Sequence, residues 1–145
     1  MEMGIVQVGI GSVILYIEGN KLTKIELSNK KLDEKECGIF TEQIKQYFDG
    51  KRKTFDFEVK LTSGPVFQKI WDYVKKIPYG TTQTYGEIAK KLKTNPRVIG
   101  FAMASNPLPI YIPCHRVVSK KGLGGYTGGL EWKKYLLNLE KKYSQ

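Results

Sequence analysis

The spacing of apolar residues changes from a strand pattern to a helix pattern partway along this 145-residue chain, and this change most limits its fold. Three β-branched runs come first, at residues 4–10, 12–19 and 21–28. Tight breaks at Gly11 and Gly19 separate them, which predicts a small antiparallel meander. Residues 38–48 then place apolar side chains at helical spacing. We therefore expect an α+β protein whose N-terminal α/β lobe, residues 1–62, contains an antiparallel sheet.

Residues 63–145 predict a mainly helical C-terminal domain. Ser63-Gly64-Pro65 begins a helix whose buried side comprises Phe67, Ile70, Trp71, Val74 and Ile77. Thr84-Tyr85-Gly86-Glu87 has capping-box spacing and begins a second helix. Asn95-Pro96 caps and begins a third. A last helix is expected over about 128–141, capped by Thr127. Two short helices joined by a tight turn are typical of a helix-turn-helix, although ordinary helical hairpins share this pattern.

One face of the third helix carries a cation and almost no other side chain. Arg97, Gly100 and Ala104 follow one another at i, i+3 and i+7. Small residues allow a backbone to approach another surface closely. The face could pack tightly on another helix, or it could enter a narrow groove with Arg97 as a probe or wedge. The basic charge of this half favours the groove.

The net charge of +10 lies entirely in the second half of the chain. Residues 1–60 hold 10 basic and 10 acidic residues, whereas residues 61–145 hold 14 basic and 4 acidic ones. This segregation favours a polyanionic partner over a lysine-rich surface that serves solubility alone. No run of 18 apolar residues and no secretory signal is present, so we expect a cytoplasmic protein that does not bind membranes.

Cys114 lies beside His115, the only histidine of the chain, and a thiol next to a base is typical of an activated sulfur nucleophile. Two cysteines and one histidine cannot supply a four-ligand zinc site, so we expect no metal. The glycine-rich stretch 119–129 matches no phosphate or dinucleotide pattern, and we expect no cofactor. Glu140 lies on or beside the inward stripe of the last helix. There it is either paired internally or in a surface salt bridge with a nearby lysine, Lys133 or Lys141.

Three sequence blocks follow one another at close spacing: residues 106–110 (NPLPI), 113–118 (PCHRVV) and 125–130 (GYTGGL). Together they resemble the methylated-DNA–protein-cysteine methyltransferases, also called O6-alkylguanine-DNA alkyltransferases. The resemblance is close over residues 63–142. It implies a ribonuclease H-like N-terminal lobe and a winged helix-turn-helix-like C-terminal domain.

The resemblance also implies roles for individual residues. Cys114 is the alkyl acceptor, His115 removes the thiol proton through a water, and Glu140 orients the histidine. The other implied roles are a structural residue behind the site (Asn106), a proton donor to the leaving oxygen (Tyr85), an arginine finger (Arg97), a backbone carbonyl that reads the guanine amino group (Val117), the pocket wall (Tyr126 and Thr127) and a pocket-lining lysine (Lys133).

The implied function is DNA repair by direct damage reversal. The protein flips O6-alkylguanine, with O4-alkylthymine as a further candidate, out of duplex DNA and transfers the alkyl group irreversibly to its own cysteine, once per molecule. The expected partner is double-stranded DNA, bound through the minor groove by a monomer. Two other functions remain open: a non-catalytic sensor that binds alkylated bases, and a cysteine hydrolase that turns over many times.

Overall fold

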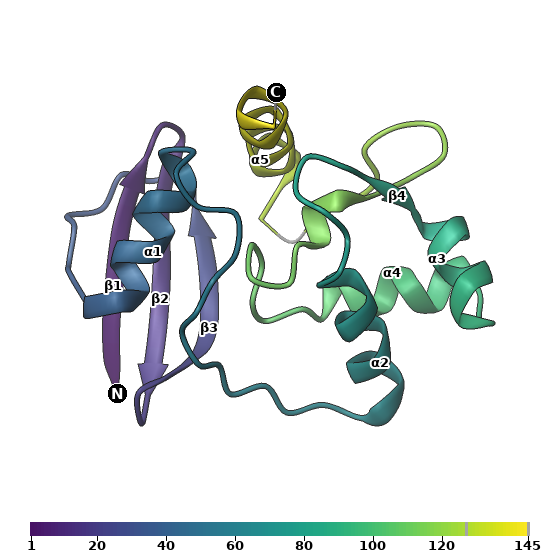
Figure 1. The fold of residues 1–145 in the computed structure, drawn as a ribbon, viewed down its shortest axis with the longest axis horizontal. Helices are drawn as coiled ribbons and strands as arrows, with labels where there is room; N and C mark the ends of the chain where they lie inside the picture. The colour runs from purple at the N-terminus through teal and green to yellow at the C-terminus, as the bar shows by residue number, and fades with distance from the viewer. Residues whose placement is uncertain (127, 145) are drawn as a thin grey trace. The chain divides into compact units, whose positions relative to one another are not determined.

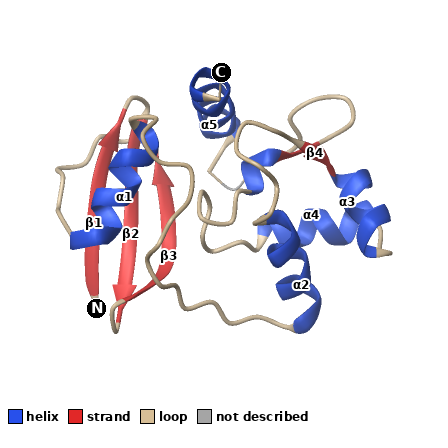
Figure 2. Ribbon diagram, viewed as in Figure 1, coloured by secondary structure: helices blue, strands red, loops and turns tan. Residues whose placement is uncertain are grey.

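The computed structural model describes residues 1–126 and 128–144 of the chain. The chain divides into two compact units, residues 1–61 and 62–145 (Figure 1). Figure 2 shows that most of the strand content belongs to the first unit, whereas helices and loops make up most of the second. The mixed helix-and-sheet class expected from the sequence is confirmed.

The first unit is built on an antiparallel sheet in the order β1 (Glu2–Val8), β2 (Gly11–Glu18) and β3 (Lys21–Ser28). Gly11 must lack a side chain, because a Cβ there would lie 1.8 Å from the Ser28 carbonyl oxygen. The second turn places Gly19 and Asn20 at φ 57° and 64°, a left-handed conformation that these residue types tolerate. The predicted meander is confirmed.

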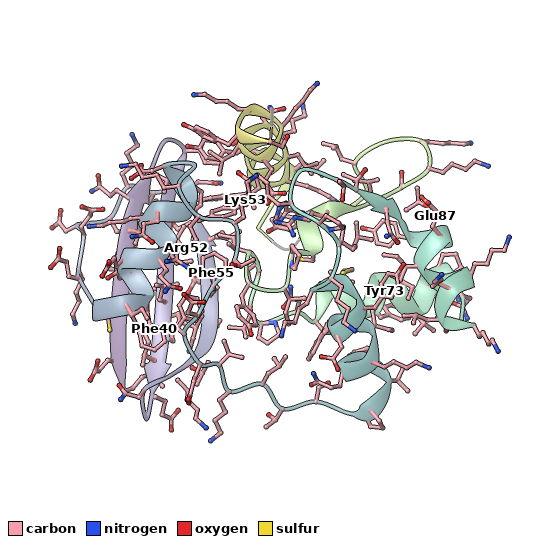
Figure 3. The ribbon with its side chains drawn as sticks, in the orientation of Figure 1. Phe40, Arg52, Lys53, Phe55, Tyr73 and Glu87 are labelled. Atoms are coloured by element: carbon pink, nitrogen blue, oxygen red, sulfur yellow. The ribbon has the colours of Figure 1, made fainter. Side chains whose placement is uncertain are left out.

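Helix α1 (Gly38–Phe48) covers one face of this sheet, at the position that the sequence spacing predicts (Figure 1). Its aromatic side chains hold the following segment in place. The Phe40 and Phe57 rings lie 5.3 Å apart, and Phe55 lies 5.2 Å from Phe57 and 5.8 Å from Tyr47 (Figure 3 labels Phe40 and Phe55). The segment that contains Phe55 and Phe57 therefore contributes to the core of the first unit.

The second unit begins with α2 (Pro65–Val74), followed by a short strand β4 (Gln83–Thr84), then α3 (Tyr85–Leu92) and α4 (Pro96–Ala104). Trp71 donates its indole N–H to the Ala102 carbonyl at 2.8 Å, which fastens α2 to α4. Tyr73 donates its hydroxyl to the Gln83 side chain at 2.7 Å, which links α2 to β4 (Figure 3 labels Tyr73).

Local capping sets the hairpin of α3 and α4. The Thr84 hydroxyl accepts from the Glu87 N–H while the Glu87 carboxylate accepts from the Thr84 N–H, which completes the predicted capping box (Figure 3 labels Glu87). Lys93 is the C-cap of α3 and ends the helix in a left-handed conformation with φ 58°. The Asn95 side chain then accepts from the Val98 N–H at 3.1 Å, so both predicted helix starts are confirmed.

The remainder of the second unit is a short 3₁₀ turn, η1 (Cys114–Arg116), a strand β5 (Val117–Val118) and helix α5 (Leu130–Tyr143). Strand β5 pairs with β4 in parallel, a contact between distant segments that the sequence pattern does not indicate. Among the described residues, no helix is both long and apolar enough to cross a membrane.

Two helix boundaries differ from the prediction. Helix α2 ends at Val74, although the side chain of Ile77 is buried as expected. The last helix begins at Leu130, two residues later than expected, because Gly129 adopts φ 96° and cannot belong to it. The predicted cap Thr127 lies outside the described residues.

Candidate active site

The loop that leads into Cys114 is fixed by the buried side chain of Asn106. Its amide nitrogen donates to the Ile112 carbonyl at 2.9 Å, and its amide oxygen accepts from the Leu108 N–H at 2.9 Å. These two bonds satisfy backbone groups that a buried loop would otherwise leave unpaired. Asn106 therefore holds the shape of the loop from which Cys114 projects.

Cys114 is 3% exposed and lies at the wall of a cavity of about 430 Å³. The other lining residues are Tyr85, Gly100, Met103, Ala104, Gly125 and Tyr126. Burial raises the pKa of the Cys114 thiol, against the opposing effects of a hydrogen bond from Asn106 and the charge of Lys133. The thiol thus stays protonated at neutral pH unless a base removes its proton.

That base candidate lies next in the chain. His115 is fully buried, and its Nε2 lies 2.6 Å from a carboxylate oxygen of Glu140, which is 1% exposed. The two side chains come from η1 and α5, separated by 25 positions. Because Glu140 is buried and paired internally, the alternative of a surface salt bridge is wrong.

The guanidinium of Arg116 contacts the same carboxylate. Its Nε donates to Oε1 of Glu140 at 2.8 Å, its Nη2 donates to Oε2 at 2.9 Å, and its Nη1 donates to the Ile77 carbonyl at 2.8 Å. The motifs of the sequence did not single out Arg116 as a site residue. The available signal was an arginine within an apolar run, where a buried charge requires a partner.

The network sets the protonation states of Glu140 and His115. Burial would raise the pKa of the Glu140 carboxyl, but the hydrogen bonds from His115 and Arg116 and the charge of Arg116 outweigh it and hold that pKa well below its usual range. Burial lowers the pKa of His115 despite the bond to Glu140, and the charges of Arg116 and Lys133 lower it further. An ionised carboxylate thus lies against a neutral imidazole.

Lys133 is a buried cation whose charge acts on the Cys114 thiol. Its ammonium donates to the Val117 carbonyl at 2.7 Å and to the Gly125 carbonyl at 2.9 Å, and it lies 5.8 Å from the centre of the Tyr85 ring. Burial lowers the pKa of Lys133 to about 8. The pKa of the Tyr85 hydroxyl is raised, chiefly by burial and then by the nearby Cys114. A protonated phenol therefore borders the cavity at neutral pH, and the buried Lys133 cation lies next to that phenol.

Helix α4 connects the cavity to the surface. Gly100 and Ala104 line the Cys114 cavity, and Arg97 lies on the same exposed face of the helix. A neighbouring hollow of about 670 Å³ shares Tyr85 and Gly100 with this cavity and also contains Arg97. Phe101, which no sequence motif marks as a site residue, also lies on this helix and is 59% exposed.

Of the residues expected at the site, the cavity and its immediate surroundings bring together all but three. Arg97 is at the neighbouring hollow, Asn106 supports the loop behind Cys114, and Thr127 lies outside the described residues. Among the residues that the structure describes, no group of histidine, cysteine, aspartate and glutamate could hold a metal ion.

A cysteine at the wall of a cavity, beside a neutral histidine that an ionised carboxylate holds in place, defines a protein class with one activated thiol nucleophile. A family model described as "6-O-methylguanine DNA methyltransferase, DNA binding domain" matches residues 65–142, more than half of the chain. The chain belongs to the 6-O-methylguanine DNA methyltransferase family.

Individual relatives agree with this assignment. A methylated-DNA–protein-cysteine methyltransferase of Methanocaldococcus vulcanius is 50% identical over 102 residues, which cover 67% of this chain and 62% of the relative. Its counterpart from Archaeoglobus fulgidus is 38% identical over 132 residues, covering 87% and 90%. The solved structure of Mycobacterium tuberculosis OGT in complex with DNA is similar with a TM-score of 0.85 at 31% identity, covering 97% of this chain and 93% of that one.

The match to two of the methyltransferases spans less than two thirds of their length, namely 62% of the Methanocaldococcus vulcanius protein and 60% of the Methanocaldococcus jannaschii protein. The similarity to the Archaeoglobus fulgidus protein and to the Mycobacterium tuberculosis structure covers both units of the chain.

Proposed function

We propose that this protein repairs DNA by transferring an alkyl group from the O6 atom of guanine to the sulfur of Cys114. The observation that carries the proposal is the position of that sulfur. It lies at the wall of a cavity of about 430 Å³, next to a neutral histidine that is available as a base. The family membership and the names of the relatives support the same reaction.

The chemistry requires the thiol to lose its proton and the guanine to gain one. His115 Nδ1 has no hydrogen-bond partner among the described protein residues and is the atom that takes the thiol proton, through a water. The sulfur then forms a bond to the alkyl carbon while the bond from that carbon to O6 breaks. The electron pair of the broken bond stays with the guanine, which O6-alkylation had deprived of its ring N–H proton. The thiol thus loses one proton to His115 and the guanine gains one, so the protein and DNA together gain or lose no proton.

Two further groups support the departure of guanine. Tyr85 remains protonated because its pKa is raised, so its hydroxyl serves as the donor toward the leaving oxygen. The ammonium of Lys133 stabilises negative charge on the sulfur. The product is a thioether, which is a poor leaving group, so each molecule acts once.

The cavity accepts a base only if the base leaves the duplex. We propose that α4 enters the minor groove, where Arg97 fills the space left by the flipped nucleotide, because unstacking a base costs a few kcal/mol that such a wedge offsets. The Val117 carbonyl, which accepts from Lys133, has a second lone pair for the guanine amino group. Tyr126 supplies part of the pocket wall, and we assign Thr127 to the same wall from the resemblance.

The finer assignments belong to the same proposal. We assign residues 1–62 to a ribonuclease H-like lobe and residues 63–145 to a winged helix-turn-helix-like domain that binds DNA and carries the reaction. The protein acts as a monomer in the cytoplasm and uses no cofactor or metal. The preferred partner is duplex DNA with O6-alkylguanine, and O4-alkylthymine is a second candidate substrate.

The test is incubation with duplex DNA that carries a labelled methyl group on guanine O6. One equivalent of label on Cys114, with no further turnover, supports alkyl transfer. Tight binding of the lesion without label would instead support a sensor, and continued release of product beyond one equivalent would support a cysteine hydrolase. Cys37→Ser is the matched control, because this cysteine belongs to the first unit and its replacement should leave transfer intact.

A further inference from the structure

Glu140 is shared between two donors of different character, His115 and Arg116. Oxygen Oε1 accepts from the Arg116 Nε at 2.8 Å and from the Gly80 N–H at 3.1 Å. Oxygen Oε2 lies 2.6 Å from His115 Nε2 and accepts from the Arg116 Nη2 at 2.9 Å. Each oxygen therefore has two partners, and the carboxylate is fully satisfied inside the protein.

This arrangement fixes the tautomer of His115. An ionised carboxylate only accepts hydrogen bonds, so the proton in the 2.6 Å contact belongs to His115 Nε2. In the neutral imidazole, Nδ1 then carries a lone pair and no proton. This is the form that accepts a proton from the thiol side.

A histidine beside a lone ionised carboxylate would tend to become an imidazolium, which accepts no further proton. Here the guanidinium of Arg116 contacts both oxygens of that carboxylate and compensates its charge. We propose that Arg116 is a positioning residue for the reaction: it holds Glu140 in the geometry that orients His115 and keeps His115 neutral. This inference rests on the proposed role of His115 as the base.

The other charged and titratable groups near the network either disfavour the imidazolium form of His115 or lie at the edge of the network. Lys133 from α5 adds positive charge that disfavours the imidazolium. The centre of the Tyr79 ring lies 5.6 Å from the Arg116 guanidinium, and after burial the charges of Glu140 and Tyr143 also raise the pKa of its hydroxyl. The pKa of Tyr79 is raised by burial, so it stays neutral in the working range. The Cys114 thiol is protonated before reaction. Arg116 is therefore the cation that directly compensates Glu140.

The experiment uses the fact that His115 is the only histidine of the chain. Nitrogen NMR of the labelled imidazole in the full-length protein reports its tautomer and its titration without overlap. We expect the wild-type protein to show the Nε2–H tautomer and a neutral ring at pH 7. An imidazolium at pH 7, or a proton on Nδ1 of the neutral ring, would overturn the proposal before any variant is made.

Two variants then separate charge from shape. Arg116→Gln removes the positive charge, and we expect the titration midpoint of His115 to rise by about one to three pH units. The acid limb of the transfer rate, measured with a free O6-alkylguanine base, should move by the same amount. Arg116→Lys keeps the charge and should give a smaller rise. Lys141→Gln, which removes an exposed charge next to Glu140 in the sequence, is the control and should leave the titration unchanged.

A merely structural Arg116 would lower the melting temperature of both variants and leave the His115 midpoint in place, and that result contradicts the proposal. If Arg116→Gln does not fold, the wild-type spectrum decides, because an imidazolium at pH 7 or a proton on Nδ1 of the neutral ring contradicts the proposal. The proposed function fails separately. In that case His115 is neutral and titrates as expected, but Cys114 accepts no alkyl group.

Discussion

Glu140→Gln is the substitution that most sharply probes the network behind the thiol. Glutamine matches glutamate in shape but replaces one oxygen by an amide NH₂. Each carboxylate oxygen accepts from two donors in the structure. Whichever way the amide turns, its NH₂ therefore faces two N–H donors, and the Arg116 guanidinium loses its counter-charge.

The size of the effect follows from the burial of the pair. Removal of one partner of a buried ion pair costs about 3–5 kcal/mol, because the remaining charge stays desolvated and unpaired. A typical folded domain is stable by about 5–15 kcal/mol. We therefore expect the melting temperature of Glu140→Gln to fall by roughly 10 °C at pH 7. Alkyl transfer should slow by about 100-fold, because the base loses its orientation.

The pH dependence of stability tests independently whether Glu140 is ionised in the folded protein. The pKa of Glu140 is held below its usual range in the folded protein, so its contribution to stability is present above the ordinary carboxyl pKa of about 4.3. This contribution is lost as the pH falls from there toward the folded pKa. The stability gap between wild-type protein and Glu140→Gln should consequently be widest near neutral pH and narrow below about pH 4.

The assays are thermal unfolding across this pH range and single-turnover transfer from methylated duplex DNA. Glu131→Gln is the matched control, since Glu131 is an exposed glutamate on the same helix. Equal melting temperatures for Glu140→Gln and Glu131→Gln at pH 7 would refute the assignment of Glu140 as a buried, charge-compensated acceptor.

The remaining predictions concern the cavity, helix α4 and the basic charge of the second unit. Gly124→Ala would place a Cβ 2.9 Å from the Tyr85 ring at a position with φ 75°. It should therefore reduce the free energy of unfolding by about 1 kcal/mol and slow the transfer of bulky alkyl groups more than that of methyl. An unchanged ratio of the two transfer rates would contradict this. Arg97→Ala should slow transfer from duplex DNA but not from a free alkylated base, and equal losses on both would reject its role as a wedge. Binding of duplex DNA should weaken steeply as salt rises, because lysine and arginine contacts release counterions; a flat response measured by fluorescence anisotropy would argue against a basic DNA surface.

The parts of the fold that depend on neighbouring residues were predictable from the sequence. The capping residues Thr84 and Asn95 act within one helical turn, and both helix starts are found where their spacing predicts them. The three strands of the first unit follow likewise from β-branched runs and glycine turns. Local physics decides these features, so a local pattern is sufficient to find them.

The features that the sequence did not reveal depend on distant partners. Strand β5 exists because it pairs with β4, which is more than 30 positions earlier. Arg116 acquires its importance only when α5 brings Glu140 to it and the turn after α2 presents the Ile77 carbonyl. The burial of Glu140 likewise remained open between an internal and a surface position, because helix periodicity alone places it at the edge of the buried stripe.

Mass spectrometry of the intact protein after exposure to duplex DNA with O6-methylguanine shows directly whether Cys114 is consumed when it acts. We predict that the protein gains the mass of one methyl group, that peptide analysis locates it on Cys114, and that a second exposure adds nothing. Cys114→Ser should bind the same DNA and gain no mass. A methyl group on Cys37, or repaired DNA with an unmodified protein, would contradict the proposal.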